Sequence, residues 1–351
     1  MTDVVLSSGT LDVEFRERGE AHAAPFPDAH TLGVIDYGPR PSGPSLSRRG
    51  VELAVPMAAA PADGFAEVWT VNRPVATGEH HGIHYAHDGE HLFCAGRIPP
   101  SLCYARKTEE AYAALLGVID RLGYHSVFRM WNFIGHINED NAERLEIYQD
   151  FCLGRAMAFE KSRIPLRRLS AATGIGALGE GISFYALTAR TASCTPLENP
   201  RQLAAYRYPP RYGPKPPSFA RATYVRHAGA GPGSAAAGER DRASGRLYVS
   251  GTASILGHAS VHRGRIEEQV RTTLDNIAGV IGDANAAAHG LDHGYRLTDL
   301  HRVKVYVRRA EDLGTVRRMC GEAFSPEAAT VFLNVDICRS DLLVEIEGIA
   351  R

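Results

Sequence analysis

The sequence contains the same order of strands and helices twice, and this repeat constrains the fold more than any other feature. Each copy begins with a short apolar strand closed by glycine, at residues 92–96 and 247–251. An amphipathic helix follows in each, with apolar residues every three or four positions: Ala111, Leu115, Val118, Ile119 and Leu122, then Ile266, Val270, Leu274, Ile277 and Ile281. A strand, a second helix and two strands complete each copy. Two tandem β-α-β-α-β-β units in 351 residues predict an α+β protein of two domains.

The remaining elements have matching positions in the two copies. After the first helix, the expected strand, helix and two closing strands span 127–134, 143–161, 170–177 and 182–189 in the first copy, and 302–307, 311–324, 330–337 and 342–350 in the second. We assign residues 1–225 to an N-terminal domain and 246–351 to a C-terminal domain. The stretch between them, 227–245, is rich in Gly, Ala and Ser, which is typical of a mobile surface connector.

The last expected strand carries two carboxylates in an apolar setting. Its alternation places Glu345 and Glu347 on one face. Burial of an ionisable carboxylate is costly unless function requires it, so Glu345 is the first catalytic candidate, and Glu347 is expected to matter less. From these residues alone, a solvated sheet edge is the alternative. Tyr185 falls at the matching position of the first copy, so only the second copy keeps the carboxylate.

Composition excludes several classes of function. The 39 basic and 40 acidic side chains form no long run of one sign, so there is no electrostatic footprint for nucleic acid. No apolar run is long enough to span a bilayer and the N-terminus shows no signal-peptide pattern, which predicts a soluble cytoplasmic protein without membrane partners. The sequence leaves the oligomeric state open between monomer and trimer. The cysteines form no CxxC pair and are expected to be reduced thiols: Cys94, Cys103, Cys152, Cys194, Cys320 and Cys338.

Two motifs that suggest a bound metal or nucleotide are interpreted otherwise. The histidines between His80 and His91 lie among Gly and Asp at turn-like positions without a Cys at ligand spacing, so a polar surface hairpin is favoured over a zinc site. The glycines at 174, 176 and 179 precede a strand, whereas a dinucleotide fingerprint opens a helix. We therefore expect no metal site.

The segment 198–224 is rich in proline but also carries aromatic and basic residues: Tyr206, Tyr208, Tyr212, Phe219, Arg201, Arg207 and Arg211. This mixture is too aromatic for a solvated linker. Proline stiffens an extended loop, and Tyr and Arg side chains offer donors suited to a carboxylate ligand. The alternative is a loop that only packs across the domain junction.

Six segments, in the same order, resemble those of the chorismatases. They are RMWNFIGHIN, YQDFCLGRAMAF, SAATGIGA, ENPRQLAAYRYPPRYGPKPPSFARA, SGTASI and DICRSDLLVEIEG. The duplicated unit itself resembles the reactive imine deaminase superfamily, with its chorismate mutase-like fold, whose members end in a strand with a glutamate. Simple deaminases carry an arginine on the preceding strand, but here that stretch, 328–332, reads AATVF. Enamine hydrolysis is therefore not expected.

The resemblance implies removal of the enolpyruvyl ether of chorismate as pyruvate. Protonation of the vinyl ether needs a neutral carboxylic acid, and burial of Glu345 would raise its pKa and favour that form. The regenerated carboxylate can then stabilise the oxocarbenium ion until pyruvate departs. This chemistry needs no metal or organic cofactor.

Two positions indicate the product. Gly251 and Cys338, which lies seven residues before Glu345, match the chorismatases that form 3-hydroxybenzoate. Gly leaves room for a different ring pose, and a thiol can accept or relay a proton. Taken singly, Gly251 would be a strand-end bulge and Cys338 a core thiol. We expect 3-hydroxybenzoate and pyruvate. The alternatives are a hydrolytic chorismatase that gives a dihydroxycyclohexadiene carboxylate, and a non-catalytic protein that binds small carboxylates.

Chorismate has two carboxylates, so its pocket needs at least two strong donor groups. Arg155, on the same expected helix as Tyr148, lies in the YQDFCLGR segment and is the first choice, because a guanidinium binds a carboxylate with two hydrogen bonds. The sequence does not decide among the candidates for the second carboxylate, which are Arg207, Tyr212, Arg318 and Arg339.

Overall fold

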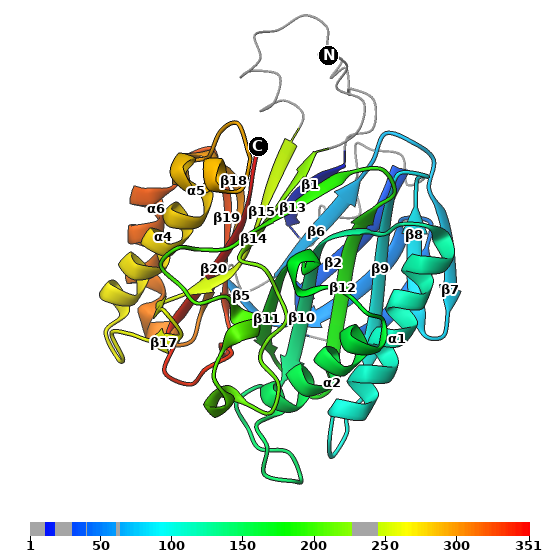
Figure 1. The fold of residues 1–351 in the computed structure, drawn as a ribbon, viewed down its shortest axis with the longest axis horizontal. Coiled ribbons are helices and arrows are strands. Elements are labelled where there is room, and N and C mark those ends of the chain that lie inside the picture. Colours follow the sequence, from blue (N-terminus) through cyan, green and yellow to red (C-terminus); the bar gives the residue numbers. More distant parts are fainter. Residues whose placement is uncertain (1–10, 18–29, 40, 61–63, 227–244) are drawn as a thin grey trace, which may run out of the picture.

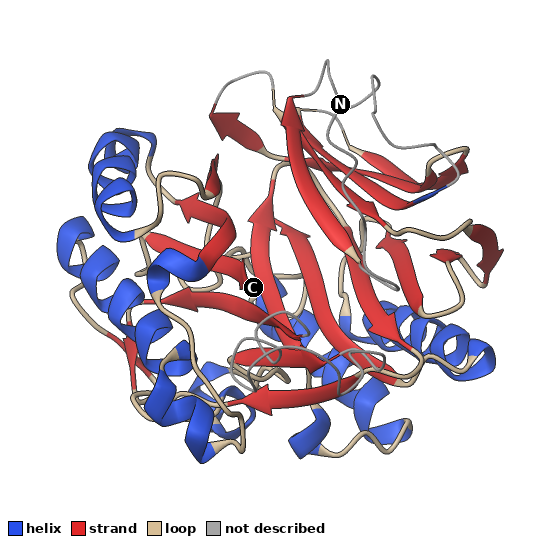
Figure 2. Ribbon diagram, turned by 90° about the horizontal axis from the view of Figure 1, so that it is seen from above, coloured by secondary structure: helices blue, strands red, loops and turns tan. Residues whose placement is uncertain are grey.

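Three β-sheets surround one central core, and helices cover the outer faces of two of them (Figure 1). The computed structural model describes residues 11–17, 30–39, 41–60, 64–226 and 245–351. The view from above shows the helices along two sides of the molecule, whereas strands form the remaining edge (Figure 2). The predicted connector at 227–245 lies almost wholly outside the described residues.

The first repeat forms a six-stranded sheet in the order β11-β10-β12-β9-β8-β7. Its elements are β7 (Ala76–His80), β8 (Ile83–His87), β9 (His91–Ile98), α1 (Ala105–Leu122), β10 (Ser126–Gly135), α2 (Ile147–Lys161), β11 (Ala171–Ala177) and β12 (Ile182–Ala189). The apolar stripe of α1 and the inner side of α2 pack on one face of this sheet, as the spacing predicts. The β7–β8 pair is the predicted histidine-bearing hairpin.

The second repeat has the same strand order. Its elements are β15 (Gly245–Ala253), α4 (Ile266–Ile281), α5 (Asp283–Ala288), β18 (Leu300–Val307), α6 (Leu313–Ala323), β19 (Ala329–Asn334) and β20 (Val344–Ala350). The order β15-β20-β18-β19 repeats the order β9-β12-β10-β11, and in each unit only the last pair is parallel. The predicted tandem units are therefore confirmed.

The strand register contradicts the predicted match between Tyr185 and Glu345. Arg129 on β10 pairs with Leu187 and Ala171, as Arg302 on the equivalent strand β18 pairs with Ile349 and Ala329, so Tyr185 corresponds to Glu347. The first unit has an aromatic side chain where the second has a carboxylate. Trp131 stacks on Tyr185 with ring centroids 4.4 Å apart.

A third sheet, near the N-terminus, was not predicted. It has the order β1-β6-β2-β4-β3 and consists of β1 (Asp12–Glu17), β2 (Thr31–Gly38), β3 (Ser42–Ser47), β4 (Gly50–Pro56) and β6 (Phe65–Thr70). These strands match neither copy of the repeat. Their inward side chains, such as Tyr37 and Trp69, complete the central core.

The second sheet extends beyond its repeat. The strands β13 (Ser193–Leu197) and β14 (Ala222–Arg226) add to its β15 edge, and β5 (Ala58–Ala60) adds next to β19. The predicted N-terminal domain, residues 1–225, therefore contributes strands to the second sheet. Hydrogen-bond partners across such distances in the chain are not visible in a strand's own sequence. A short hairpin, β16 (Ile255–Leu256) with β17 (Ala259–Ser260), follows β15.

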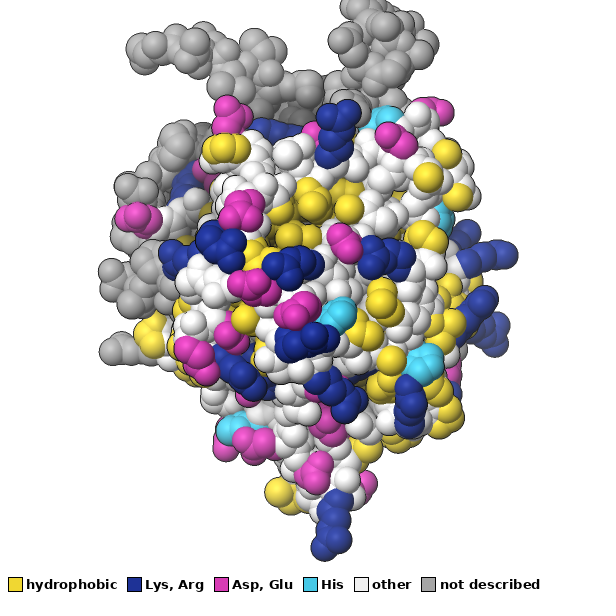
Figure 3. All heavy atoms as spheres, turned by 90° about the vertical axis from the view of Figure 1, so that its left-hand side faces the viewer, with side chains coloured by type: hydrophobic (Ala, Val, Ile, Leu, Met, Phe, Trp, Pro, Cys, Tyr) yellow, Lys and Arg dark blue, Asp and Glu magenta, His cyan; other side chains and the backbone are white. Residues whose placement is uncertain are grey.

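Further structural findings concern nucleic-acid binding, membrane spanning and metal binding, which are not expected from the sequence. Acidic and basic side chains are interspersed on the flank formed by α4, α5 and α6 (Figure 3). In the described part of the chain, no helix is long and apolar enough to cross a membrane. Within those same residues there is no group of three His, Cys, Asp or Glu side chains that could hold a metal ion. All six cysteines are free thiols.

Candidate active site

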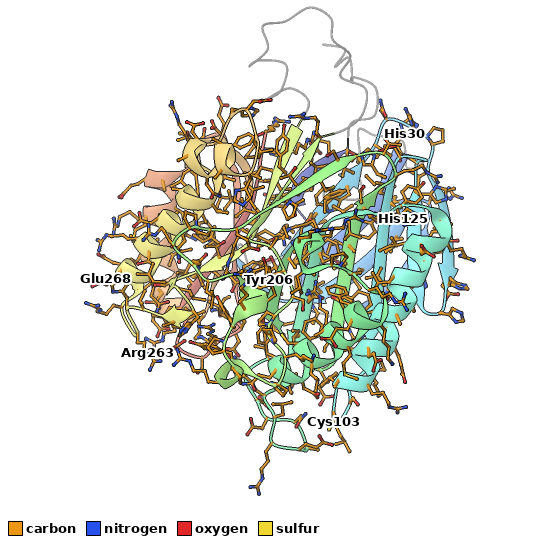
Figure 4. All side chains as sticks on the ribbon, viewed as in Figure 1. His30, Cys103, His125, Tyr206, Arg263 and Glu268 are labelled. Atoms are coloured by element: carbon orange, nitrogen blue, oxygen red, sulfur yellow. The ribbon has the colours of Figure 1, made fainter. Side chains whose placement is uncertain are left out.

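A cavity of about 430 Å³ lies between the two repeat units and is closed on one side by the proline-rich segment. Its walls come from α2, β10, β11, β15, the segment before β14 and the loop before β20. The lining includes Asn132, Glu146, Tyr148, Cys152, Arg155, Thr173, Tyr212, Arg221, Gly251, Cys338, Arg339 and Glu345. Figure 4 shows Tyr206 of the proline-rich segment, which is not a lining residue, between the two helical flanks. It shows Arg263, which lines the cavity, on the side of the second unit.

Glu345 is presented to this cavity by β20. Its side chain is buried, with 3% of the residue exposed. Burial and the nearby charge of Glu347 raise the pKa of Glu345 to about 8, against the smaller opposing effects of Cys338, Arg129 and Arg221. The carboxyl group is therefore protonated at neutral pH, which is the form that can donate a proton.

Glu347, two residues further on, is held in the opposite protonation state. Arg129 Nη2 donates to its Oε2 at 2.6 Å, Trp131 Nε1 donates to its Oε1 at 2.8 Å, and the Nζ of Lys304 lies 2.9 Å from Oε1. Although burial alone would raise it, Lys304 and Arg129 lower the pKa of Glu347 to about 2. Two carboxylates on one strand face thus become an acid and a fixed anion.

Gly251 and Cys338 both touch the acid. A Cβ atom added at Gly251 would lie 2.0 Å from Oε1 of Glu345, so only glycine leaves the carboxyl group in this position. Cys338 Sγ donates to Oε2 of Glu345 at 3.8 Å. Burial and the Glu345 carboxylate raise the pKa of Cys338 well above its usual value. Cys338 is therefore a neutral thiol that can relay a proton, while the predicted role as a proton acceptor in its own right is disfavoured.

Arg155 and Tyr148 lie on the cavity wall, as predicted. Arg155 is buried, donates from Nη1 to the carbonyl oxygen of Ser218, and stands 4.5 Å above the ring of Phe159. Among the described residues, its Nε has no hydrogen-bond partner. Burial raises the pKa of Tyr148 well above its usual value, so its hydroxyl is a neutral donor beside Cys338 and Glu345.

The comparisons with known proteins agree with this geometry. A family model described as "Chorismatase FkbO/Hyg5-like, N-terminal" matches residues 67–188. The chain is 50% identical over 333 residues to a 3-hydroxybenzoate synthase of Streptomyces hygroscopicus, an alignment that covers 95% of each protein. It is 44% identical to a chorismatase of Streptomyces rapamycinicus, over 92% of this chain and 93% of that one. The chain belongs to the chorismatase family. A crystal structure of a chorismatase superposes with a TM-score of 0.89 at 41% identity, covering 99% of this chain and 100% of the other.

The four candidates for the second carboxylate separate clearly in this chorismatase fold. Tyr212 and Arg339 line the cavity, with the Arg339 guanidinium 4.0 Å from the Tyr212 ring centroid. Arg207 is exposed and is not among the lining residues. Arg318 lies on the outer side of α6, where Nη1 donates to Glu322 at 3.0 Å. The structure thus brings Arg339 and Tyr212 to the site and leaves Arg207 and Arg318 away from it.

Arg221 and Glu146 are among the lining residues of this family member that were not predicted from the sequence. Arg221 is buried, donates from Nη2 to Tyr208 Oη at 2.8 Å, and has an Nε without a partner among the described residues. It is the arginine of the quoted SFARA segment, and the resemblance of that segment to the family was its only signal. Burial and Asp140 raise the pKa of Glu146 to about 7, against the opposing charge of Arg339. No signal in the sequence pointed to Glu146, because it was placed inside an expected helix.

Proposed function

We propose that the protein converts chorismate to 3-hydroxybenzoate and pyruvate. The single observation that carries the proposal is a buried, protonated Glu345 at the wall of a cavity, in contact with both Gly251 and Cys338. The 50% identity with a protein described as a 3-hydroxybenzoate synthase supports the same product. A cytoplasmic location remains a prediction.

The reaction follows from the geometry in a series of steps. Glu345 gives its proton to the terminal methylene of the enolpyruvyl group, which forms a C–H bond and leaves positive charge on the ether carbon. The resulting carboxylate stabilises this oxocarbenium ion. The bond between the ring and the ether oxygen then breaks and pyruvate leaves, while the oxygen of the neighbouring ring hydroxyl bonds to the same ring carbon and loses its proton, which gives an epoxide. The epoxide opens by breaking the bond to the carbon that first carried the hydroxyl, and its oxygen takes up a proton. The ring carbon that now carries the oxygen loses its hydrogen as a proton, which leaves aromatic 3-hydroxybenzoate. The two products together contain all the atoms of chorismate, so no water is consumed.

Arg155 and Tyr148 on one wall, and Arg339 with Tyr212 on another, are proposed to bind the two carboxylates. These groups come from α2, the loop before β20 and the proline-rich segment, so they can hold a dianion from two sides. Arg221 adds a buried cation next to the cavity. The raised pKa of Tyr148 keeps its hydroxyl a neutral donor that adds no further charge.

The pH dependence of the reaction follows from the raised pKa of Glu345. The protonated form is required, so kcat/KM is expected to be independent of this group well below pH 8 and to fall about tenfold per pH unit above its pKa of about 8. Initial rates of pyruvate release measured from pH 4 to pH 10 check this expectation. A basic limb near the ordinary carboxyl range, around pH 4 to 5, would contradict the assignment of Glu345 as the acid.

Product choice is expected to depend on Gly251 and Cys338. Because a Cβ at position 251 would displace the Glu345 carboxyl group, the double substitution Gly251→Ala, Cys338→Ala should shift the product toward the dihydroxycyclohexadiene carboxylate while pyruvate release persists. Cys338→Ala alone serves as the comparison, since it leaves the carboxyl group in place. A double variant that still forms only 3-hydroxybenzoate would show that other residues determine the product.

The proposal is tested by incubating the purified protein with chorismate and identifying both products by mass. We expect 3-hydroxybenzoate and pyruvate in equal amounts. The hydrolytic alternative gives a non-aromatic ring product whose mass includes one water. Saturable binding of chorismate without pyruvate release would favour the binding-protein alternative.

A further inference from the structure

A cluster of four buried charges lies where the three sheets meet, directly behind the acid. Glu67 comes from β6 of the N-terminal sheet, Arg129 from β10 of the first unit, and Lys304 and Glu347 from β18 and β20 of the second. Their residues are 1%, 1%, 4% and 2% exposed. Two cations and two anions make the cluster neutral overall.

Lys304 is the bridge of this cluster. Its Nζ donates to Oε2 of Glu67 at 2.6 Å and lies 2.9 Å from Oε1 of Glu347. Glu67 in turn is fixed by Trp69 Nε1 at 2.7 Å, and by the hydroxyls of Tyr185 and Tyr37 at 3.0 and 3.1 Å. Arg129 holds the opposite side of Glu347 at 2.6 Å.

The fold alone does not require these charges. Removing four charged groups from water is expensive, and packed apolar side chains of similar size often stabilise a core as well or better. The surroundings are already apolar, since Trp69, Trp131 and Tyr306 line the same core. We therefore relate the function of the cluster to its neighbour, Glu345.

We propose that Glu67 is a positioning residue for Glu345: through Lys304 it fixes Glu347 as the anion that stands behind the acid. The inference rests on the acid role proposed above for Glu345. It assigns a role to the N-terminal sheet, which contributes Glu67 to a site otherwise built from the two repeat units. Glu67 does not line the cavity and would not touch the substrate.

The titratable and charged groups around Glu345 and Glu347 influence the pKa values of these two side chains. Those near Glu345 are Arg129, Glu146, Tyr148, Cys152, Arg221, Cys338, Arg339 and Glu347. Those near Glu347 and Lys304 are Tyr37, Glu67, Arg129, Thr173, Tyr185 and Tyr306. Within the second set, Glu67 is the partner of Lys304 on the side away from Glu347.

Removal of one charge from a neutral cluster has a defined sign. The substitution Glu67→Gln leaves one excess positive charge, which favours the ionised form of Glu345. The proton of Glu345 should then be lost at lower pH, by about one pH unit for a nearby charge in a protein interior. The double substitution Glu67→Gln, Lys304→Met removes one charge of each sign and leaves the cluster neutral, but the lost cation is the one 2.9 Å from Oε1 of Glu347. Its negative charge is then less neutralised, and the proton of Glu345 should be retained to higher pH.

The test is a titration of Glu345 in the full-length protein without substrate. The infrared band of its protonated carboxyl group is assigned by its disappearance in Glu345→Gln and followed from pH 5 to pH 10. We expect the midpoint to fall in Glu67→Gln, to rise in the double variant, and to return toward the parent value in Glu67→Asp. The basic limb of kcat/KM should move in the same directions.

A matched control is available on the other side of the molecule. Glu109 is 9% exposed and pairs with Lys161 between α1 and α2, outside the cavity lining. Glu109→Gln also removes a carboxylate from an ion pair but should leave the midpoint unchanged.

The inference is overturned if the midpoint stays within a few tenths of a unit of the parent in both cluster variants. Should Glu67→Gln not fold, the double variant still decides. Normal turnover by Glu345→Gln would instead refute the proposed acid role of Glu345, and this result is distinct from the titration of the cluster variants.

Discussion

Replacement of Glu345 by Gln is expected to slow pyruvate release from chorismate by about 10²- to 10⁴-fold, the usual contribution of a general acid. The amide has nearly the shape of the protonated carboxyl group but has no acidic proton to give. Because Glu345 is buried and already neutral at pH 7, the substitution adds no charge and should preserve the fold. The rate is measured by coupling pyruvate to its reduction, and the fold by circular dichroism.

Glu146→Gln is the matched control for this experiment. Glu146 also lines the cavity and has a pKa raised to about 7, but it does not contact Gly251 or Cys338 in the way that Glu345 does. Its substitution should change the rate only a few-fold. If Glu345→Gln keeps near-normal turnover in a folded protein while Glu146→Gln does not, the acid role belongs to Glu146.

Arg155→Ala is expected to weaken chorismate binding by about 2 kcal/mol or more, the order of a charge-assisted bidentate contact. This corresponds to a Michaelis constant raised by about 30-fold. The guanidinium lies buried against Phe159 on the cavity wall, so a carboxylate bound there would meet it away from bulk water. Steady-state kinetics over a range of chorismate concentrations measure the effect.

Two further variants separate charge from packing at Arg155. Arg155→Lys keeps the positive charge but loses the planar donor pair, and should fall between the parent and Arg155→Ala. Arg207→Ala removes an exposed arginine of the proline-rich segment and should leave the Michaelis constant unchanged. An Arg155→Ala protein with parental kinetics would place the carboxylate elsewhere, with Arg221 and Arg339 as the next residues to test.

The repeat units could be predicted from the sequence because their signals are local. Apolar spacing in α1 and α4 and the short apolar strands fix each element within a few residues, and the duplication supplies the strand order. The sheet formed by residues 12–70 has no counterpart in the repeat, and its strands are recognisable only by the core that they complete. For the same reason the pairing of β14 with β15 was not foreseen.

The candidate site was predicted in part. Five of the predicted residues line one cavity: Glu345, Gly251, Cys338, Arg155 and Tyr148. They could be predicted because each lies in a segment that resembles those of the family. Arg207 and Arg221 both lie in the same quoted segment, yet only Arg221 lines the cavity. The backbone path of a proline-rich loop decides which side chains turn inward, and this path does not follow from spacing.

The neutral form of Glu345 was expected from its burial, but the ionised form of Glu347 was not predicted from the sequence. Glu345 and Glu347 occupy equivalent positions on one strand face, and alternation alone treats them alike. Their difference arises from Arg129 and Lys304, which contact one carboxylate and not the other. These cations come from separate strands, and Glu67, which holds Lys304, comes from a sheet that was not anticipated. Glu347 is thus expected to matter less as a group in contact with the substrate. Its charge still raises the pKa of Glu345.

The most direct test of the central claim is the reaction of chorismate in deuterium oxide, with both products examined by mass and by NMR. If Glu345 delivers a solvent-exchanged proton to the enolpyruvyl methylene, newly formed pyruvate carries one deuterium in its methyl group, and the ring product is 3-hydroxybenzoate. Early time points limit later exchange of the methyl hydrogens. Pyruvate without deuterium would instead mean direct transfer of a ring hydrogen to the methylene, and would contradict acid catalysis by Glu345.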